Sequence, residues 1–168
     1  MAITKLKGTE IKTNADLPQA GKPAPEFTLT NNDLEDVSLQ NFLGSKLILN
    51  IFPSLDTPVC SMSVRKFNSE AENLPDTKVL CISRDLPFAQ KRFCGAEGLD
   101  NVITLSEMRD NNFSDAYGVR ITEGPMSTLF ARAVIILDEE GVVRYVQLVP
   151  EITQEPDYED VLNNLNKI

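Results

Sequence analysis

Residues 46–52 read Lys46-Leu47-Ile48-Leu49-Asn50-Ile51-Phe52, a mostly apolar run that Pro53 ends. Such a run is typical of a strand that is buried on both faces of a sheet. From Pro58 to Leu74 the apolar residues recur at helical spacing, and residues 78–83 form a second mostly apolar run. A strand, a helix and a strand with short connections form a βαβ unit, so we expect the two strands to be parallel.

The segments that follow continue this alternation of helices and strands. The expected elements are a helix that starts at Asp85 and Pro87 and ends at Gly95 and Gly98 just after Cys94, a strand over 102–105, a helix over 112–117, antiparallel strands over 130–137 and 142–148, and a helix after Pro156. A βαβ half followed by a ββα half predicts an α/β, thioredoxin-like fold with a central mixed sheet flanked by helices.

The length of 168 residues is that of one compact domain. The chain has no internal repeat and no linker-like tract, so we expect a single domain over residues 1–168. Residues 4–13, around Gly8-Thr9, have the pattern of an N-terminal β-hairpin extension. A frayed start of the chain is the alternative.

The composition excludes several classes of function. Sixteen Lys and Arg against 25 Asp and Glu give a net charge of −9 without a basic cluster, so we expect neither nucleic acid nor an anionic membrane as a partner. The absence of histidine excludes Ser–His–Asp and Cys–His catalysis and histidine-ligated metals, and we expect no metal and no bound cofactor. The chain start lacks the apolar run of a signal peptide and no stretch approaches membrane-spanning length, which indicates a cytoplasmic protein.

Three cysteines, Cys60, Cys81 and Cys94, are too few, and odd in number, for an extracellular disulfide framework. In a reducing compartment they are either inert core thiols or redox groups. Thr57 suits a helix N-cap and Pro58 the first helical position, which places Cys60 in the first turn. The free amides and the helix dipole there favour a thiolate. The alternative is a small buried residue that begins a helix.

Arg132 lies in the expected strand over 130–137, where alternation points its side chain inward. A buried guanidinium needs a negative partner, because an unpaired charge in the interior is costly. A carboxylate and the Cys60 thiolate are both suitable partners, and the pattern alone leaves the choice open.

The other two cysteines lie in different local contexts. Cys94 precedes Gly95 and Gly98 at the end of a short helix, in a segment that we expect to open locally at low cost. Cys81 lies in the middle of an apolar strand, where an inert core role is expected.

The spacing of Pro53, Thr57 and Cys60 resembles the P-x-x-x-T-x-x-C signature of the peroxiredoxins, and the surrounding residues resemble their thiol peroxidase branch. The resemblance covers about residues 21–156. The stretches that carry it are Asn50-Ile51-Phe52-Pro53-Ser54, Thr57-Pro58-Val59-Cys60, Ser63-Val64-Arg65-Lys66-Phe67-Asn68, Leu80-Cys81-Ile82-Ser83, Asp85-Leu86-Pro87-Phe88-Ala89-Gln90 and Arg92-Phe93-Cys94-Gly95.

The resemblance implies a peroxidase that reduces hydrogen peroxide and organic hydroperoxides. Cys60 would be the peroxidatic thiolate that becomes a sulfenic acid, and Cys94 the resolving cysteine that forms an intramolecular disulfide with it. Thr57 would orient thiolate and peroxide, Pro53 would shield the thiolate from water, and Arg132 would stabilise the negative charge. The resemblance also implies thioredoxin as the reductant and a homodimer.

Two other classes of function remain open. A thioredoxin-like or glutaredoxin-like oxidoreductase normally has C-x-x-C, and this chain has Ser63 in place of the second cysteine. A monothiol C-x-x-S enzyme is compatible with that residue but leaves Thr57 and Arg132 unexplained. The other alternative is a scaffold or redox sensor that passes oxidation to a partner without turnover.

Overall fold

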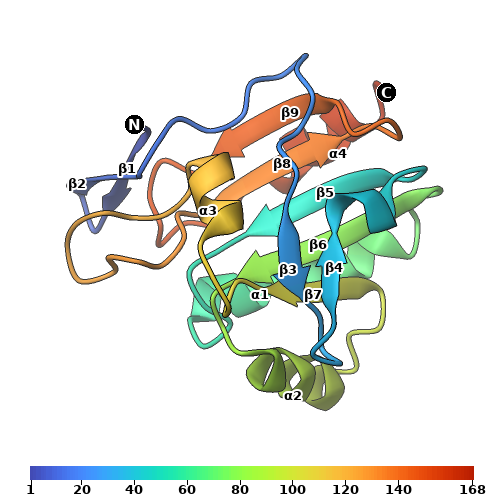
Figure 1. Cartoon of the computed structure of the whole chain (residues 1–168), viewed down its shortest axis with the longest axis horizontal. Helices are drawn as coiled ribbons and strands as arrows, with labels where there is room; N and C mark the ends of the chain where they lie inside the picture. The colour runs from blue at the N-terminus through green and yellow to red at the C-terminus, as the bar shows by residue number, and fades with distance from the viewer.

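The computed structural model describes all 168 residues. Seven strands form one mixed sheet in the order β4-β3-β7-β6-β5-β8-β9, and β1 and β2 form a separate hairpin (Figure 1). The elements are β1 Ile3–Leu6, β2 Thr9–Lys12, β3 Thr28–Thr30, β4 Asp36–Ser38, the 3-10 helix η1 Leu39–Phe42, β5 Lys46–Ile51, α1 Pro58–Ala71, β6 Thr77–Ser83, α2 Pro87–Glu97, β7 Val102–Ser106, α3 Asn112–Tyr117, β8 Ala133–Leu137, β9 Val143–Leu148 and α4 Tyr158–Leu165.

The predicted βαβ unit is present at the centre of this sheet. β5 and β6 are parallel and aligned from the Lys46–Thr77 pair to the Ile51–Ile82 pair, with α1 as the crossover. β8 runs antiparallel to β5, and β9 runs antiparallel to β8. The thioredoxin-like layout expected from the sequence is therefore confirmed, with a mixed sheet flanked by helices.

Two predicted boundaries differ from the observed ones by three residues. β8 begins at Ala133 rather than Phe130, because Phe130 pairs with Arg120 outside the sheet and Arg132 directly precedes the strand. α1 ends at Ala71 rather than Leu74, since Pro75 disfavours the helical conformation of the residue before it.

The helix α2 starts at Pro87 and is ended by Gly98, which are among the residues expected to mark its start and its end. It continues through Gly95 to Glu97, and Gly98 ends it in the left-handed conformation, φ 67°. Cys94 therefore lies inside the last turn. Its carbonyl oxygen accepts hydrogen bonds from the amides of Gly98 and Leu99. Leu86, not Asp85, is the N-cap residue. The Asp85 carboxylate instead accepts hydrogen bonds from Ser54 and Leu55.

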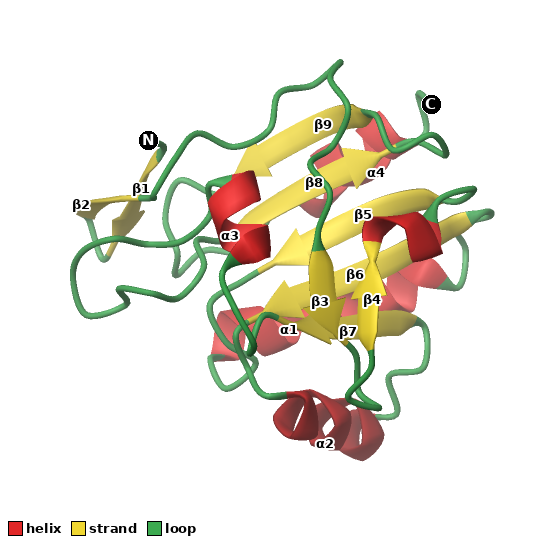
Figure 2. Ribbon diagram, viewed as in Figure 1, coloured by secondary structure: helices red, strands yellow, loops and turns green.

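Three short elements were not expected from the sequence. β3, β4 and η1 have only three or four residues each, too few for a period of alternation to be recognised. β3 joins β7 through the single pair Thr30–Ser106, and β4 is the edge strand beyond it. These elements and α3 lie over one face of the sheet in Figure 2.

Two apolar clusters occupy the two faces of the sheet. The larger cluster includes Phe27, Phe113 and Phe130, beneath β3 and α3. The second lies beneath α1 and α4, which are seen behind the sheet in Figure 1, and contains Cys60 and Cys81. Half-buried Cys94 packs against the second cluster. All three cysteines thus lie on the same side of the sheet.

The N-terminal hairpin is formed and is bound to the rest of the chain. Its turn at Lys7-Gly8 has φ of 50° and 84°, and the carboxylate of Glu151 accepts both turn amides at 2.7 and 3.1 Å. The amide of Ile152 also donates to the Lys5 carbonyl. We propose on these contacts that residues 1–168 form a single domain. None of the helices combines the length and the apolar character needed to cross a bilayer.

Candidate functional site

The site lies where β5 ends and α1 begins, at the carboxyl end of the central strands. Thr57 occupies the N-cap position, as expected, but its hydroxyl does not cap the helix. It donates to the Ser54 carbonyl at 2.9 Å, and the Thr57 amide donates to the same oxygen at 3.2 Å. Cys60 is the third residue of α1 and is fully buried. The Ser54 carbonyl thus holds Thr57, and the first turn of α1 sets the position of Cys60 relative to Thr57.

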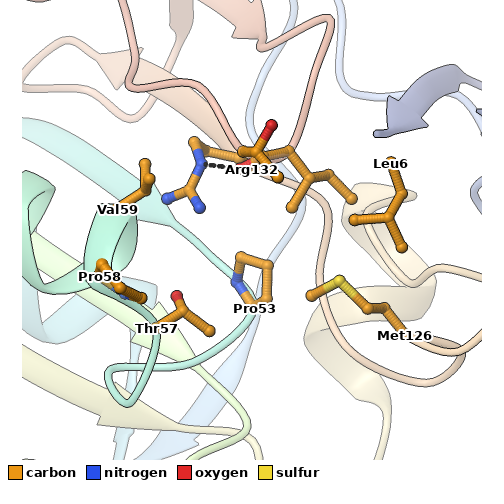
Figure 3. A pocket seen from close by; sticks show the side chains of 9 residues that line it. Leu6, Pro53, Thr57, Pro58, Val59, Met126 and Arg132 are labelled. Atoms are coloured by element: carbon orange, nitrogen blue, oxygen red, sulfur yellow. Dashed lines mark hydrogen bonds between the residues drawn. The ribbon is translucent and has the colours of Figure 1, made fainter. Parts of the chain in front are cut away.

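Arg132 is 1% exposed and reaches Cys60 from the start of β8. Its Nη2 lies 3.2 Å from the Cys60 Sγ, and its Nε donates to the Ile152 carbonyl at 2.9 Å, the dashed bond in Figure 3. Its Nη1 has no hydrogen-bond partner. No carboxylate lies within salt-bridge distance of Arg132. Two partners were expected for this guanidinium, a carboxylate or the Cys60 sulfur, and it is the Cys60 sulfur that lies beside it.

A cavity of about 290 Å³ opens beside this pair. Figure 3 shows Pro58 and Val59 on one side of it, Leu6 and Met126 on the other, and Pro53 between them. Its walls are mostly apolar apart from Arg132 and two threonines. The lining residues are Leu6, Pro53, Thr57, Pro58, Val59, Met126, Arg132, Ile152 and Thr153. Arg132, whose buried Nη1 has no hydrogen-bond partner, is thus the charged residue of a mostly apolar cavity.

Cys94 lies in α2 and carries a free thiol, as do the other two cysteines. Burial raises the pKa of the Cys94 thiol, and the nearby Thr104 hydroxyl acts in the opposite direction. Two hydrogen bonds hold the last turn of α2 against α1, between Arg65 and Glu97, at 2.9 and 3.0 Å. Arg65 also lies over the Phe93 ring, 5.7 Å from its centroid. The segment around Cys94 is thus attached to the helix that carries Cys60.

The chain matches one family model over most of its length. The Redoxin model matches residues 19–162, which include Pro53, Thr57, Cys60, Cys94 and Arg132. The chain belongs to the Redoxin family. No group of three or more His, Cys, Asp or Glu side chains in this Redoxin is placed to hold a metal ion.

Relatives of this Redoxin carry a more specific name. Proteins of Mycobacterium bovis and Mycobacterium tuberculosis named thiol peroxidase are 54% identical to it over 162 residues, covering 96% of this chain and 97% of theirs. The resemblance to the thiol peroxidases noted in the sequence is confirmed by this identity.

Solved structures agree with the fold of this Redoxin. A peroxiredoxin-like protein from Aquifex aeolicus is 39% identical, with a TM-score of 0.93 over 99% of this chain and 97% of that one. A thiol peroxidase from Chromobacterium violaceum has a TM-score of 0.91 over the same shares of the two chains at 24% identity, a likeness that concerns the fold alone.

Sequence reasoning did not identify three apolar residues that line the cavity. Leu6, Met126 and Ile152 come from the hairpin, the loop before β8 and the segment after β9, which are far apart in the chain. No local pattern marks them, since each is an ordinary apolar residue of its own segment. They come together because the hairpin, the loop before β8 and the segment after β9 pack against one another.

Cys81 of this Redoxin is fully buried in β6, and burial raises its pKa to about 12. Its sulfur accepts a hydrogen bond from the side-chain amide of Asn50, with 3.7 Å between Nδ2 and Sγ. A thiol with such a pKa is almost never a thiolate near neutral pH, and only the thiolate is nucleophilic. The inert role predicted from the sequence therefore remains our interpretation of this residue.

We expect Cys81→Ala to retain full peroxide-dependent turnover while losing about 1 kcal/mol of unfolding free energy through the small void it leaves. Steady-state assays and urea denaturation of the purified variant measure the two quantities. Loss of turnover in a folded Cys81→Ala protein would contradict the inert role.

Proposed function

We propose that this protein is a thiol peroxidase that reduces hydrogen peroxide and organic hydroperoxides, with Cys60 as the attacking group. The observation that carries the proposal is the 3.2 Å contact between the Arg132 Nη2 and the Cys60 Sγ beside an apolar cavity. A buried guanidinium without a carboxylate partner favours a negative charge at the sulfur. Its second nitrogen, Nη1, is free to donate to a peroxide oxygen.

The first chemical step forms an S–O bond and breaks the O–O bond. The Cys60 thiolate attacks the terminal peroxide oxygen, becomes a sulfenic acid and is oxidised by two electrons, while the peroxide is reduced. The leaving alkoxide or hydroxide takes a proton from water, because the chain has no histidine to supply one; when it takes the proton of the peroxide itself, Cys60 is left as the sulfenate and is protonated by water afterwards. Arg132 stabilises the charge on the oxygens during this transfer.

Thr57 and Pro53 have supporting roles in this step. The Thr57 hydroxyl uses its hydrogen on the Ser54 carbonyl, so its oxygen is left with lone pairs that can accept a hydrogen bond from the peroxide. Pro53 is buried and lines the cavity, where it limits the access of water to the sulfur. The peroxide is thus held between an acceptor, Thr57, and a donor, Arg132.

The second step converts the sulfenic acid to a disulfide. Cys94, as a thiolate, attacks the Cys60 sulfur, the S–O bond breaks, and water leaves with the proton that the step requires. The dithiol of thioredoxin then reduces the Cys60–Cys94 disulfide. The packing of both cysteines against one apolar cluster supports this pairing. Cys60 is fully buried in α1, so the ends of α1 and α2 that carry the two thiols must unwind for the sulfurs to meet.

We expect the disulfide state to exchange backbone hydrogens faster in residues 57–62 and 90–98, because the first turn of α1 and the last turns of α2 are then open. Hydrogen exchange followed by mass spectrometry, with the reduced protein as reference, measures this. Exchange that stays the same in both segments would contradict the unwinding.

We expect Glu97→Gln to accelerate both hydrogen exchange in residues 90–98 and disulfide formation, because the bond to Arg65 restrains the last turn of α2. The hydrogen bond from Arg65 lowers the pKa of the Glu97 carboxyl. A depressed pKa means that this restraint is complete above the ordinary carboxyl pKa and is lost as the pH falls through the depressed value. The two proteins should therefore differ at neutral pH and converge in acid.

Glu70→Gln is the control for this comparison, because the Glu70 carboxylate forms its ion pair with Lys66 within α1, at 3.0 Å, and not with α2. It should leave exchange in residues 90–98 unchanged. Equal exchange of wild type and Glu97→Gln at neutral pH would exclude a restraint by Arg65.

We also propose a homodimer in a reducing cytoplasm. The family resemblance supports the dimer, as does the exposure of Leu86 and Phe88 by 54% and 65% at the start of α2. The cytoplasmic location agrees with three free thiols and with recycling by reduced thioredoxin. Sedimentation of the reduced and oxidised protein tests the assembly.

The function is tested by steady-state oxidation of NADPH in the presence of thioredoxin, thioredoxin reductase and a hydroperoxide. We expect turnover with cumene hydroperoxide and with hydrogen peroxide, and none for Cys60→Ser. Absence of NADPH oxidation with any peroxide would overturn the proposal. Turnover with a protein disulfide in place of peroxide would favour a monothiol oxidoreductase, and stoichiometric oxidation without turnover would favour a redox sensor.

A further inference from the structure

Asp85 lies two residues after the end of β6, and its carboxylate accepts hydrogen bonds from the loop that precedes Cys60. Oδ1 accepts from the Ser54 hydroxyl at 2.7 Å, and Oδ2 accepts from the Leu55 amide at 2.8 Å. Both donors lie some thirty residues away in the chain and belong to the connection between β5 and α1. A carboxylate that accepts a backbone amide and a hydroxyl of one loop fixes the conformation of that loop.

The contact continues from Ser54 to Thr57. The Ser54 carbonyl accepts both the hydroxyl and the amide of Thr57, at 2.9 and 3.2 Å. The Ser54 hydroxyl also accepts the Asp56 amide at 3.2 Å. Asp85 therefore holds the residue that orients the Thr57 hydroxyl, although it touches neither the Cys60 sulfur nor the cavity.

Asp85 is also connected to the helix that carries Cys94. Its Oδ2 accepts from the Ser83 hydroxyl at 2.7 Å, and the Ser83 oxygen accepts from the Gln90 amide group at 3.2 Å. Gln90 is fully buried in α2, one helical turn before Cys94, and its Oε1 has no partner. A continuous set of hydrogen bonds thus runs from α2 through Ser83 and Asp85 to the loop before Cys60.

We propose that Asp85 is a positioning residue for the oxidation of Cys60, holding Ser54, and through it Thr57, in the arrangement that reacts with peroxide. The inference rests on the proposed function and goes beyond it, since Asp85 contacts no reacting atom. Through Ser83 and Gln90 the same carboxylate links the loop to α2, so opening of α2 also loosens the loop. Loosening after oxidation frees the first turn of α1 for the disulfide.

The experiment compares the rate of Cys60 oxidation by cumene hydroperoxide with the rate of Cys60 alkylation by iodoacetamide, in Asp85→Ala and in wild type. Alkylation requires an accessible thiolate but no orientation of a peroxide by Thr57. A misplacement of about 1 Å in an oriented reaction costs about 100-fold, so we expect Asp85→Ala to slow oxidation by about 10- to 100-fold. Alkylation should stay unchanged or become faster.

Two further variants keep the test decisive. Asp85→Asn keeps one acceptor oxygen for the Leu55 amide and should recover part of the oxidation rate. Ser54→Ala removes a single bond to Asp85 and should slow oxidation less than Asp85→Ala does. Combined with Asp85→Ala it should add little, because both changes break the same connection.

Asp138→Ala is the matched control. Asp138 also accepts two loop amides, from Glu140 and Val142 at 3.0 and 2.9 Å, but in the turn after β8 at the opposite end of the sheet. It should lower the melting temperature without changing the ratio of oxidation to alkylation.

The possible outcomes distinguish the positioning role of Asp85 from the proposed peroxidase function. The positioning role is overturned if wild type reacts with peroxide and folded Asp85→Ala has the same ratio of Cys60 oxidation to Cys60 alkylation as wild type. If Asp85→Ala does not fold, the same ratio is measured in Asp85→Asn and Ser54→Ala, and equality with wild type has the same meaning. If wild-type Cys60 stays reduced in the presence of peroxide, the proposed function is overturned together with the inference. A lower ratio in the Asp85 and Ser54 variants, but not in Asp138→Ala, supports the positioning role.

Discussion

Arg132→Lys is expected to slow the oxidation of Cys60 by about 100- to 1,000-fold, the usual cost of removing one preorganised donor from a developing negative charge. The arginine uses Nε on the Ile152 carbonyl and Nη2 on the Cys60 sulfur, and keeps Nη1 free. A lysine has one nitrogen and cannot occupy these three directions together. Because the chain has no tryptophan to report the reaction, quenched samples are analysed by mass spectrometry.

Arg144→Lys is the control for this substitution. Arg144 forms its ion pair with Asp138, in a different part of the molecule from the cavity and at 47% side-chain exposure. Its conversion to lysine should leave the oxidation rate of Cys60 unchanged. An Arg132→Lys protein that is folded and reacts as fast as wild type would contradict the role of the guanidinium.

Cys94→Ser is expected to leave the oxidation of Cys60 intact while abolishing recycling by thioredoxin. Without the resolving thiol the sulfenic acid accumulates, and a second equivalent of peroxide converts it to a sulfinic acid. Dimedone, which labels sulfenic acids, should therefore modify Cys60 in this variant and to a much smaller extent in wild type. Mass analysis of the labelled peptides measures both.

Cys81→Ala serves as the control for Cys94→Ser, since Cys81 is another buried thiol on the same side of the sheet. It should show wild-type recycling and little dimedone labelling. Full turnover of Cys94→Ser with thioredoxin would contradict the assignment of Cys94 as the resolving cysteine.

The central part of the fold was predictable because its signals are local. The apolar runs of β5 and β6 and the helical spacing of α1 are each contained in a single segment, and the parallel pairing follows from the short connections between them. Arg132 was expected to point inward and does so, although it lies just before β8 rather than within it. The resemblance had already singled out the two side chains that meet at 3.2 Å, Cys60 and Arg132.

The rest depends on contacts between segments distant in the chain. β3 and β4 are three residues each and are recognisable only once they lie on the larger sheet. Leu6 lines the cavity because Glu151 binds the hairpin turn. Asp85 was expected to begin a helix, whereas its carboxylate faces Ser54 and Leu55. Hydrogen bonds across some thirty residues leave no periodic pattern in a sequence.

The central claim is that Cys60 reacts with peroxide and is resolved by Cys94 of the same chain. It is tested most directly by treating the reduced protein with one equivalent of cumene hydroperoxide and analysing the intact protein and its peptides by mass spectrometry without reductant. We expect a monomer mass lower by two hydrogen atoms, with one disulfide between the peptides of Cys60 and Cys94 and a free thiol on Cys81. An unchanged mass, or a disulfide that involves Cys81 or a second chain, would contradict it.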